Sequence, residues 1–167
     1  MPSPPALPDS PFWRFSLAFY GRPGVAAACL ALQDRHGVDV NLVLLALWLG
    51  TLGCRLDQPT GDRLVQIARR WQAPAVAPLR RVRRRLKRRI AAGRLPWPEA
   101  VEAARGRLAA VELELEQVEQ LLLEASVGPV APARPDAAAA GHNFARLGLA
   151  ELAGTAEAER LLEQAFS

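Results

Sequence analysis

The sequence predicts an all-α protein with a compact helical N-terminal core, a long antiparallel αα-hairpin and a short C-terminal amphipathic tail. Three observations support this fold class. Ala and Leu dominate the 167 residues while β-branched residues are scarce, which favours helices over strands. Apolar residues recur three and four positions apart. Typical helix starts and stops separate these periodic segments.

The first two predicted helices cover residues 11–20 and 23–36. Ser10 followed by Pro11 is a typical helix start, with a capping hydroxyl and a proline at the first helical position. Gly37 is a typical residue for ending the second helix. One side of the first helix carries aromatic residues at helical spacing: Phe12, Phe15 and Phe19. We interpret them as core anchors, because aromatic side chains contribute heavily to core burial.

The third predicted helix is apolar on every face. Asp39 caps it, and the stretch from Val40 to Cys54 has no charged residue over 15 positions. A helix that crosses a membrane needs about 20 apolar residues, so the stretch predicts a core helix and no transmembrane segment. Such a helix has to be enclosed, either by neighbouring helices or by another chain.

The remaining predicted helices are an amphipathic helix at residues 60–72, a basic helix at 79–92 and a long helix at 98–125. The short connection between the last two predicts an antiparallel hairpin. The basic helix has a thin apolar stripe: Leu79, Val82, Leu86 and Ile90. We expect it to meet a heptad-like seam on the long helix, formed by Val101, Ala104, Leu108, Val111, Leu115, Val118 and Leu122.

These elements suggest one domain with flanking segments. Residues 1–9 are rich in proline and are predicted to be disordered. Residues 10–125 form a single helical domain, divided into a core (10–73) and a basic and acidic hairpin (74–125). Residues 126–142 read as an Ala/Pro linker. Residues 143–167 form a helical tail that is too short to be stable unless it docks.

Charge is concentrated in two adjacent segments. Residues 74–94 carry nine basic residues and no acid, whereas residues 95–125 carry seven Glu against two Arg. Eight of the basic residues fall within ten positions: Arg80, Arg81, Arg83, Arg84, Arg85, Lys87, Arg88 and Arg89. They predict either a nucleic-acid contact driven by counterion release or a face that is partly neutralised by the acidic helix that follows. No aromatic residue interleaves the block for base stacking, and we favour intramolecular pairing or a protein partner.

Polar residues gather at the junction of the second and third helices. With two aromatic residues as candidate walls, they define a candidate pocket: Trp13, Tyr20, Gln33, Asp34, His36, Asp39 and Asn41. His36 beside Asp34 and Asp39 could form an acid/base pair. Helix ends also collect such residues simply to satisfy free backbone groups, and we favour this structural interpretation.

The sequence lacks the usual signatures of catalysis, metal binding and export. There is no HExxH, GxSxG, P-loop or GxGxxG motif, and Cys29 and Cys54 have no metal-ligand spacing. We therefore predict no catalytic residue, no metal site and no cofactor. Isolated cysteines and an N-terminus without a signal peptide favour a cytoplasmic location.

The segment from Phe12 to Leu56 carries a family resemblance. Its pattern includes Phe12-Trp13, Tyr20, Gly24-Val25, Cys29-Leu30, Leu32-Gln33-Asp34, Gly37, Asp39-Val40-Asn41-Leu42 and Trp48. It resembles an uncharacterised family of small proteobacterial proteins of about this length, most strongly over residues 12–56. The resemblance implies a cytoplasmic bacterial helical protein and implies no reaction.

Three functional hypotheses follow from the sequence. The favoured one is a non-catalytic cytoplasmic interaction or regulatory protein that binds a protein partner or a second copy of itself through helical surfaces. The alternative is a nucleic-acid-associated protein that uses the Arg80–Arg89 block. The third is an enzyme with its site at Asp34, His36 and Asp39.

Overall fold

The computed structural model describes residues 7–167 and confirms the all-α fold, with no strand within that range. The helices are α1 (Pro11–Tyr20), α2 (Val25–His36), α3 (Val40–Thr51), α4 (Gln58–Trp71), α5 (Ala77–Ala91), α6 (Pro98–Val127), α7 (Ala137–Arg146) and α8 (Ala156–Phe166). Two short turns join them: η1 (Gln72–Val76), which is π-helical, and η2 (Ala150–Leu152), which is 3₁₀-helical. The disorder predicted for residues 1–9 falls mainly on residues 1–6, which lie outside the described residues.

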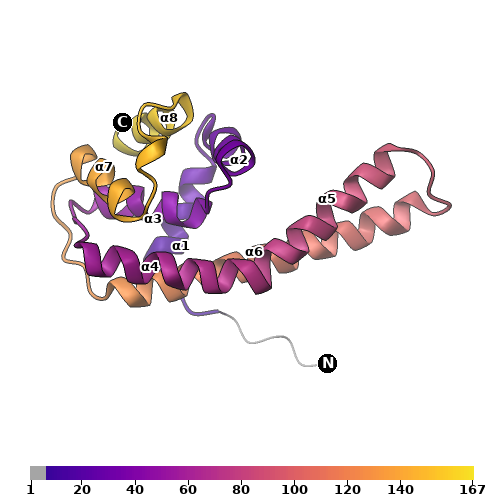
Figure 1. Ribbon diagram of the computed structural model, residues 1–167, viewed down its shortest axis with the longest axis horizontal. Coiled ribbons are helices and arrows are strands. Elements are labelled where there is room, and N and C mark those ends of the chain that lie inside the picture. Colours follow the sequence, from indigo (N-terminus) through magenta and orange to yellow (C-terminus); the bar gives the residue numbers. More distant parts are fainter. Residues whose placement is uncertain (1–6) are drawn as a thin grey trace.

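Helix α3 is the centre of the helical body (Figure 1). Every residue from Asn41 to Gly50 is buried. Helices α1, α2, α6, α7 and α8 surround it, and the Phe12 ring stacks on the Trp48 ring at 5.1 Å between centroids. The chain's own helices therefore enclose the apolar helix, without requiring a second chain.

The C-terminal region differs from the predicted linker (126–142) and tail (143–167). Helix α7 begins at Ala137, inside the predicted linker, and packs closely on α3. A Cβ added at Gly50 would lie 2.6 Å from the Ala140 Cβ. Phe144 on α7 and Leu161 on α8 are buried in the core. The alanine run that reads as low complexity is therefore a close helix contact, and the core extends to the last helix.

The buried face of α6 also differs from the predicted seam. Val111 and Leu122 are 43% and 41% exposed. The buried residues of α6 are instead Glu112, Glu119, Gln120 and Leu123. Near the body α6 packs against α1, α3 and α4 as well as η1 and α5, so the face that it buries is set by several neighbours and not by the α5 stripe alone.

Helices α5 and α6 extend away from the body as an antiparallel pair (Figure 1). Helix α4, η1 and α5 follow one another without a loop, and Pro74, which lacks a backbone N–H, lies in the π-helical turn between them. We call residues 81–111 the arm; they begin one residue beyond Arg80 and end one residue before its partner Glu112.

Within residues 7–167, no single helix is both long and apolar enough to cross a membrane. Helices α1 and α2 meet the length and composition requirement only when they are taken together, and they are bent by 101° where they join.

Candidate functional site

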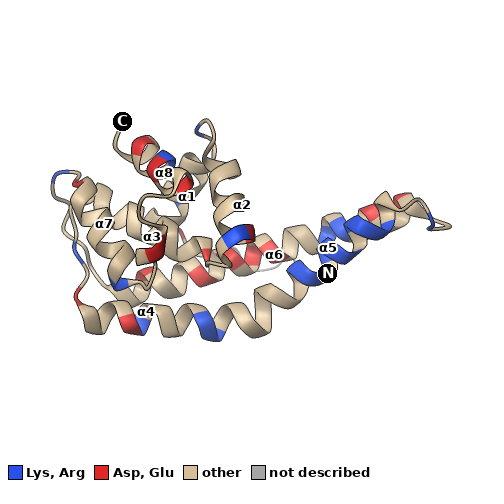
Figure 2. Cartoon of the chain, turned by 45° about the horizontal axis from the view of Figure 1, so that its top comes forward, with Lys and Arg blue, Asp and Glu red and all other residues tan. Residues whose placement is uncertain are grey.

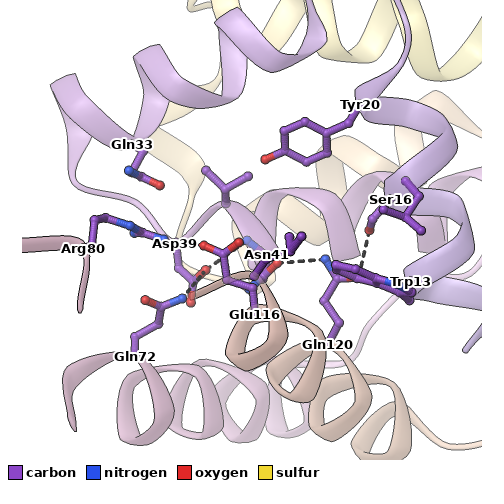
Figure 3. Close-up of a pocket in the computed structure, with 13 residues that line it drawn as sticks. Trp13, Ser16, Tyr20, Gln33, Asp39, Asn41, Gln72, Arg80, Glu116 and Gln120 are labelled. Atoms are coloured by element: carbon purple, nitrogen blue, oxygen red, sulfur yellow. Dashed lines mark hydrogen bonds and ion pairs between the residues drawn. The ribbon is translucent and has the colours of Figure 1, made fainter. Parts of the chain in front are cut away.

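A cavity of about 300 Å³ lies where the arm joins the body (Figure 3). Its walls come from α1, the end of α2, the start of α3, η1, α5 and α6. The lining residues are Trp13, Ser16, Leu17, Tyr20, Gln33, Asp39, Val40, Asn41, Gln72, Arg80, Leu113, Glu116 and Gln120. This junction pocket therefore combines an aromatic and aliphatic wall with several amides and charged groups.

Local sequence explains how these side chains reach the pocket. Trp13, Leu17 and Tyr20 lie three or four positions apart, so they share one face of α1. Asp39 is the N-cap of α3, and its side chain accepts a hydrogen bond from the Asn41 backbone N–H at 2.9 Å. The expected cap thus also places a carboxyl and an amide at the pocket.

A buried chain of amides ties the helices together behind the pocket. The Ser16 hydroxyl donates to Gln120 Oε1 at 2.9 Å, and Gln120 Nε2 donates to Asn41 Oδ1 at 2.8 Å. Asn41 Nδ2 and Gln72 Nε2 both donate to Glu119 Oε2, at 2.9 and 2.6 Å. The network links α1, α3, η1 and α6, and a buried network of this kind fixes the relative positions of its helices when its members are paired.

Asp39 and Glu119 form a carboxyl pair at the centre of this network. Asp39 Oδ2 and Glu119 Oε1 are buried and have no donor among the described residues while both groups are ionised. Burial raises the pKa of Glu119 to about 10, and its hydrogen bond to Asp39 and the charge of Asp39 add to the rise. Burial also raises the pKa of Asp39. Two carboxyls this close do not both ionise. Glu119 therefore stays protonated at neutral pH, and its hydroxyl donates a hydrogen bond to Asp39.

Ion pairs connect the pocket to the base of the arm. Arg80 donates through Nε to Glu112 at 2.8 Å and through Nη2 to Glu116 at 2.5 Å. Arg83 donates through Nε to the other oxygen of Glu112 at 2.6 Å. Although burial opposes it, the hydrogen bonds from Arg83 and Arg80 lower the pKa of Glu112. At Glu116 burial raises the pKa of the carboxyl by more than the charge of Arg80 lowers it, so the pKa lies above its ordinary value.

The structure brings most of the predicted pocket residues together. Five of them line the junction pocket: Trp13, Tyr20, Gln33, Asp39 and Asn41. Asp34 lies outside it, exposed and paired with Arg84. His36 is also exposed and forms no hydrogen bond with any described residue. The proposed acid/base pair of His36 with Asp34 or Asp39 is therefore not formed in the structure.

Several pocket residues were not identified from the sequence. They lie far along the chain on η1, α5 and α6: Gln72, Arg80, Leu113, Glu116 and Gln120, with Glu119 behind them. Glutamate and glutamine in a long helix usually face solvent, so their sequence pattern does not indicate burial. Only the packing of α6 against the body shows which of them face inward.

Figure 2 shows the basic residues gathered on α5, and their ion pairs divide the predicted basic block into two groups. Arg80, Arg83 and Arg84 form ion pairs with carboxylates. In the part of the chain that the structure describes, the other cations of the block are exposed and form no ion pair: Arg81, Arg85, Lys87, Arg88 and Arg89.

The arm and the rest of the chain carry opposite net charge. The arm has ten basic against two acidic residues, a net charge of +8, so the rest of the chain carries −4 of the total of +4. The positive field of the molecule is therefore concentrated on the arm.

The described residues contain no group of three or more His, Cys, Asp or Glu side chains arranged to hold a metal ion. Cys29 and Cys54 are free thiols, and burial raises the pKa of Cys29 to about 11, so this thiol is neutral at physiological pH.

Comparison with known protein families gives a match over most of the chain. A family described as "Protein of unknown function (DUF2390)" matches residues 11–123. No curated protein and no solved structure matches the chain. The matched segment contains every residue that lines the junction pocket and the whole arm, and it ends before α7 and α8.

Proposed function

The chain belongs to the DUF2390 family of proteins of unknown function, and we propose that it is a non-catalytic interaction protein of the bacterial cytoplasm that binds an acidic protein through its arm. The observation that carries this proposal is the arm's net charge of +8 on a helix pair that extends away from the body. The elongated shape makes both helices of the arm accessible to a partner.

Folding alone does not account for this concentration of charge. Neither α5 nor residues 98–111 of α6 contain a buried residue. Seven cations of the arm form no ion pair with a described residue, and repulsion between them costs stability. An acidic partner surface would relieve the repulsion and would speed association through electrostatic steering.

Apolar side chains beside the cations favour a protein as the partner. Trp97, at the turn between α5 and α6, is 71% exposed. Val82 and Val111 on the arm are 46% and 43% exposed. Protein interfaces are enriched in Trp and Arg, and such residues often carry most of the binding energy. The arm therefore fits a partner that offers an apolar groove with an acidic rim.

A nucleic acid is the second candidate, because the same exposed cations suit phosphate contacts. Two observations support an acidic protein over a nucleic acid. Helix α5, which carries the cations, has no aromatic residue on which bases could stack, and Trp97 is a single ring at the tip of the arm. The rest of the chain is negative, which would repel a long polyanion that passes the body.

Photo-crosslinking in the native cells tests the proposal. A photoreactive amino acid replaces Trp97 at the tip of the arm and, as the matched control, Leu30, which is 55% exposed on α2 in the body. We expect the Trp97 position, and not the Leu30 position, to give a discrete adduct that resists nuclease and contains an acidic protein. Reversing Arg85, Arg88 and Arg89 to Glu should abolish it while the circular dichroism spectrum stays helical.

Two results would overturn the proposal. One is a yield at Trp97 that does not exceed the Leu30 control. The other is an adduct that nuclease removes and that binds RNA or DNA with a steep salt dependence, which would establish the nucleic-acid alternative instead.

A further inference from the structure

We propose that the junction pocket binds a small organic cation, an ammonium group carried on a flat apolar body. Neither the family description nor the role of the arm assigns a ligand to this pocket. Four features of the pocket favour such a ligand: its charge, its unused hydrogen-bonding groups, its aromatic wall and its size.

The charged groups at the pocket and directly behind it leave one negative charge. They are Asp39, Glu112, Glu116, Glu119, Arg80 and Arg83. With one proton shared between Asp39 and Glu119, three carboxylates face two guanidinium groups. A partly enclosed site with one uncompensated negative charge favours a monovalent cation, because charges are poorly screened away from water.

The Glu116 carboxyl has an oxygen that can receive such a cation. Arg80 occupies one oxygen of Glu116, and the second oxygen accepts no hydrogen bond from the described residues. Asp39 also lines the pocket, but its Oδ2 is buried and accepts from the protonated Glu119, so Asp39 contributes negative charge and no free acceptor. An ammonium group donates strong, charge-assisted hydrogen bonds to such a carboxylate oxygen.

The opposite wall of the pocket suits an aromatic or alicyclic body. Trp13, Leu17 and Tyr20 present one face of α1, and Leu113 of α6 closes the rim. Leu17, Tyr20 and Leu113 are 54%, 41% and 50% exposed, so the rim leaves apolar surface in contact with water. Indole and phenol rings also attract a cation directly.

Figure 3 shows the Tyr20 hydroxyl and the Gln33 amide turned toward the same space as the Asp39 and Glu116 carboxyls. The Gln33 amide forms no hydrogen bond elsewhere in residues 7–167, so it is free to bind a polar group on the ligand. The volume of about 300 Å³ is at the lower limit for ligand pockets. At about 30 Å³ per water-sized group it holds on the order of ten non-hydrogen atoms.

Titration with 2-phenylethylamine, monitored by ¹H–¹⁵N NMR, tests the inference. Its neutral analogue, 2-phenylethanol, has the same ring and chain with a hydroxyl in place of the ammonium group. We expect saturable shifts at α1, α3 and η1 with the amine, and affinity about tenfold or more weaker for the alcohol, equivalent to about 1.4 kcal/mol.

Matched variants test which carboxylate binds the ammonium group. Glu116→Gln should weaken amine binding about tenfold or more and leave the alcohol unaffected. Glu114→Gln, on the same helix but exposed and without a hydrogen bond to any described residue, should leave both unchanged. Trp13→Leu should weaken both probes. Reversing the charge of Arg85, Arg88 and Arg89 should leave amine binding unchanged, which separates this site from the arm.

Three results would overturn the inference: no saturable binding of the amine to the wild-type chain, equal affinity for amine and alcohol, or the same loss from Glu114→Gln as from Glu116→Gln. If Glu116→Gln lowers helicity, Gln33→Ala takes its place. Weaker amine binding in this folded variant then supports the pocket, and unchanged binding contradicts it.

Discussion

The two ends of helix α6 place the same residue type in opposite environments. Near the body, Glu119 is fully buried and bonded to Asn41 and Gln72. Near the tip, the Glu102 side chain is 51% exposed and pairs only with Arg105, three residues further along. Acidic residues of one helix therefore hold the fold together where they are buried, whereas at the tip they contribute little to its stability.

The cations of α5 follow the same division. Arg80 is held by Glu112 and Glu116 at the base of the arm, with only 17% of its side chain exposed. Arg88, two turns further out, is exposed and forms no ion pair with a described residue. The base of the arm is thus fixed by intramolecular contacts, and the tip remains available for a partner.

The largest expected difference is between alanine substitutions at the two ends of α6. Glu119→Ala removes the acceptor of the buried Asn41 amide and leaves Gln72 with only a 3.4 Å hydrogen bond to Asp39, and we expect it to lower the free energy of unfolding by about 3–5 kcal/mol. Glu102→Ala removes an exposed pair and should change it by less than about 0.5 kcal/mol. Urea denaturation measures both, and equal losses would remove the distinction between base and tip.

A second comparison concerns which apolar residues belong to the core. Leu161 on α8 is fully buried, and Leu161→Ala should lower the free energy of unfolding by about 2–4 kcal/mol. Leu122 on α6 is 41% exposed, and Leu122→Ala should lower the free energy of unfolding by less than about 1 kcal/mol. A negligible loss at Leu161 would mean that the C-terminal helices are not part of the core.

The pH dependence of stability tests the protonated pair. The folded-state pKa of Glu119 is raised from 4.5 to about 10, so the folded state keeps a proton that the unfolded chain releases. Stability should therefore fall as the pH rises from about 5 to 9, by at most about 1.4 kcal/mol per pH unit. Glu119→Gln retains an acceptor and a donor, and should flatten this slope in chemical denaturation at pH 6 and pH 9. An unchanged slope would argue against the shared proton.

The smallest expected difference lies between two arginines of α5. Arg80→Gln leaves Glu116 without its ion pair in a half-buried site, and should lower the free energy of unfolding by about 1–2 kcal/mol. Arg88→Gln should change it by less than about 0.5 kcal/mol. Thermal unfolding monitored by circular dichroism measures both changes. A larger loss of stability from Arg88→Gln than from Arg80→Gln would show that the tip of the arm is not free of intramolecular contacts.

Local signals in the sequence account for much of the body. The predicted caps are confirmed, since Ser10 accepts from the Trp13 N–H and Asp39 from the Asn41 N–H. The uncharged third helix is buried as expected. These features depend on residues close in sequence, and neighbouring residues determine capping and helical periodicity.

The features that the sequence did not predict depend on contacts between distant segments of the chain. Glu119 meets Asn41 across 78 positions. The alanine-rich start of α7 packs against Gly50 of α3, although its composition is typical of a linker. Five of the seven predicted pocket residues line the cavity, yet three further lining residues, Leu113, Glu116 and Gln120, come from α6. Sequence periodicity does not determine which face of a long helix meets the body.

The most direct test of a fixed base and a free, partner-binding tip is one variant with Arg85, Arg88 and Arg89 changed to Glu, assayed for both stability and crosslinking. We predict a free energy of unfolding within about 1 kcal/mol of the wild type and loss of the protein adduct at Trp97. An adduct of undiminished yield in this folded variant would contradict the account.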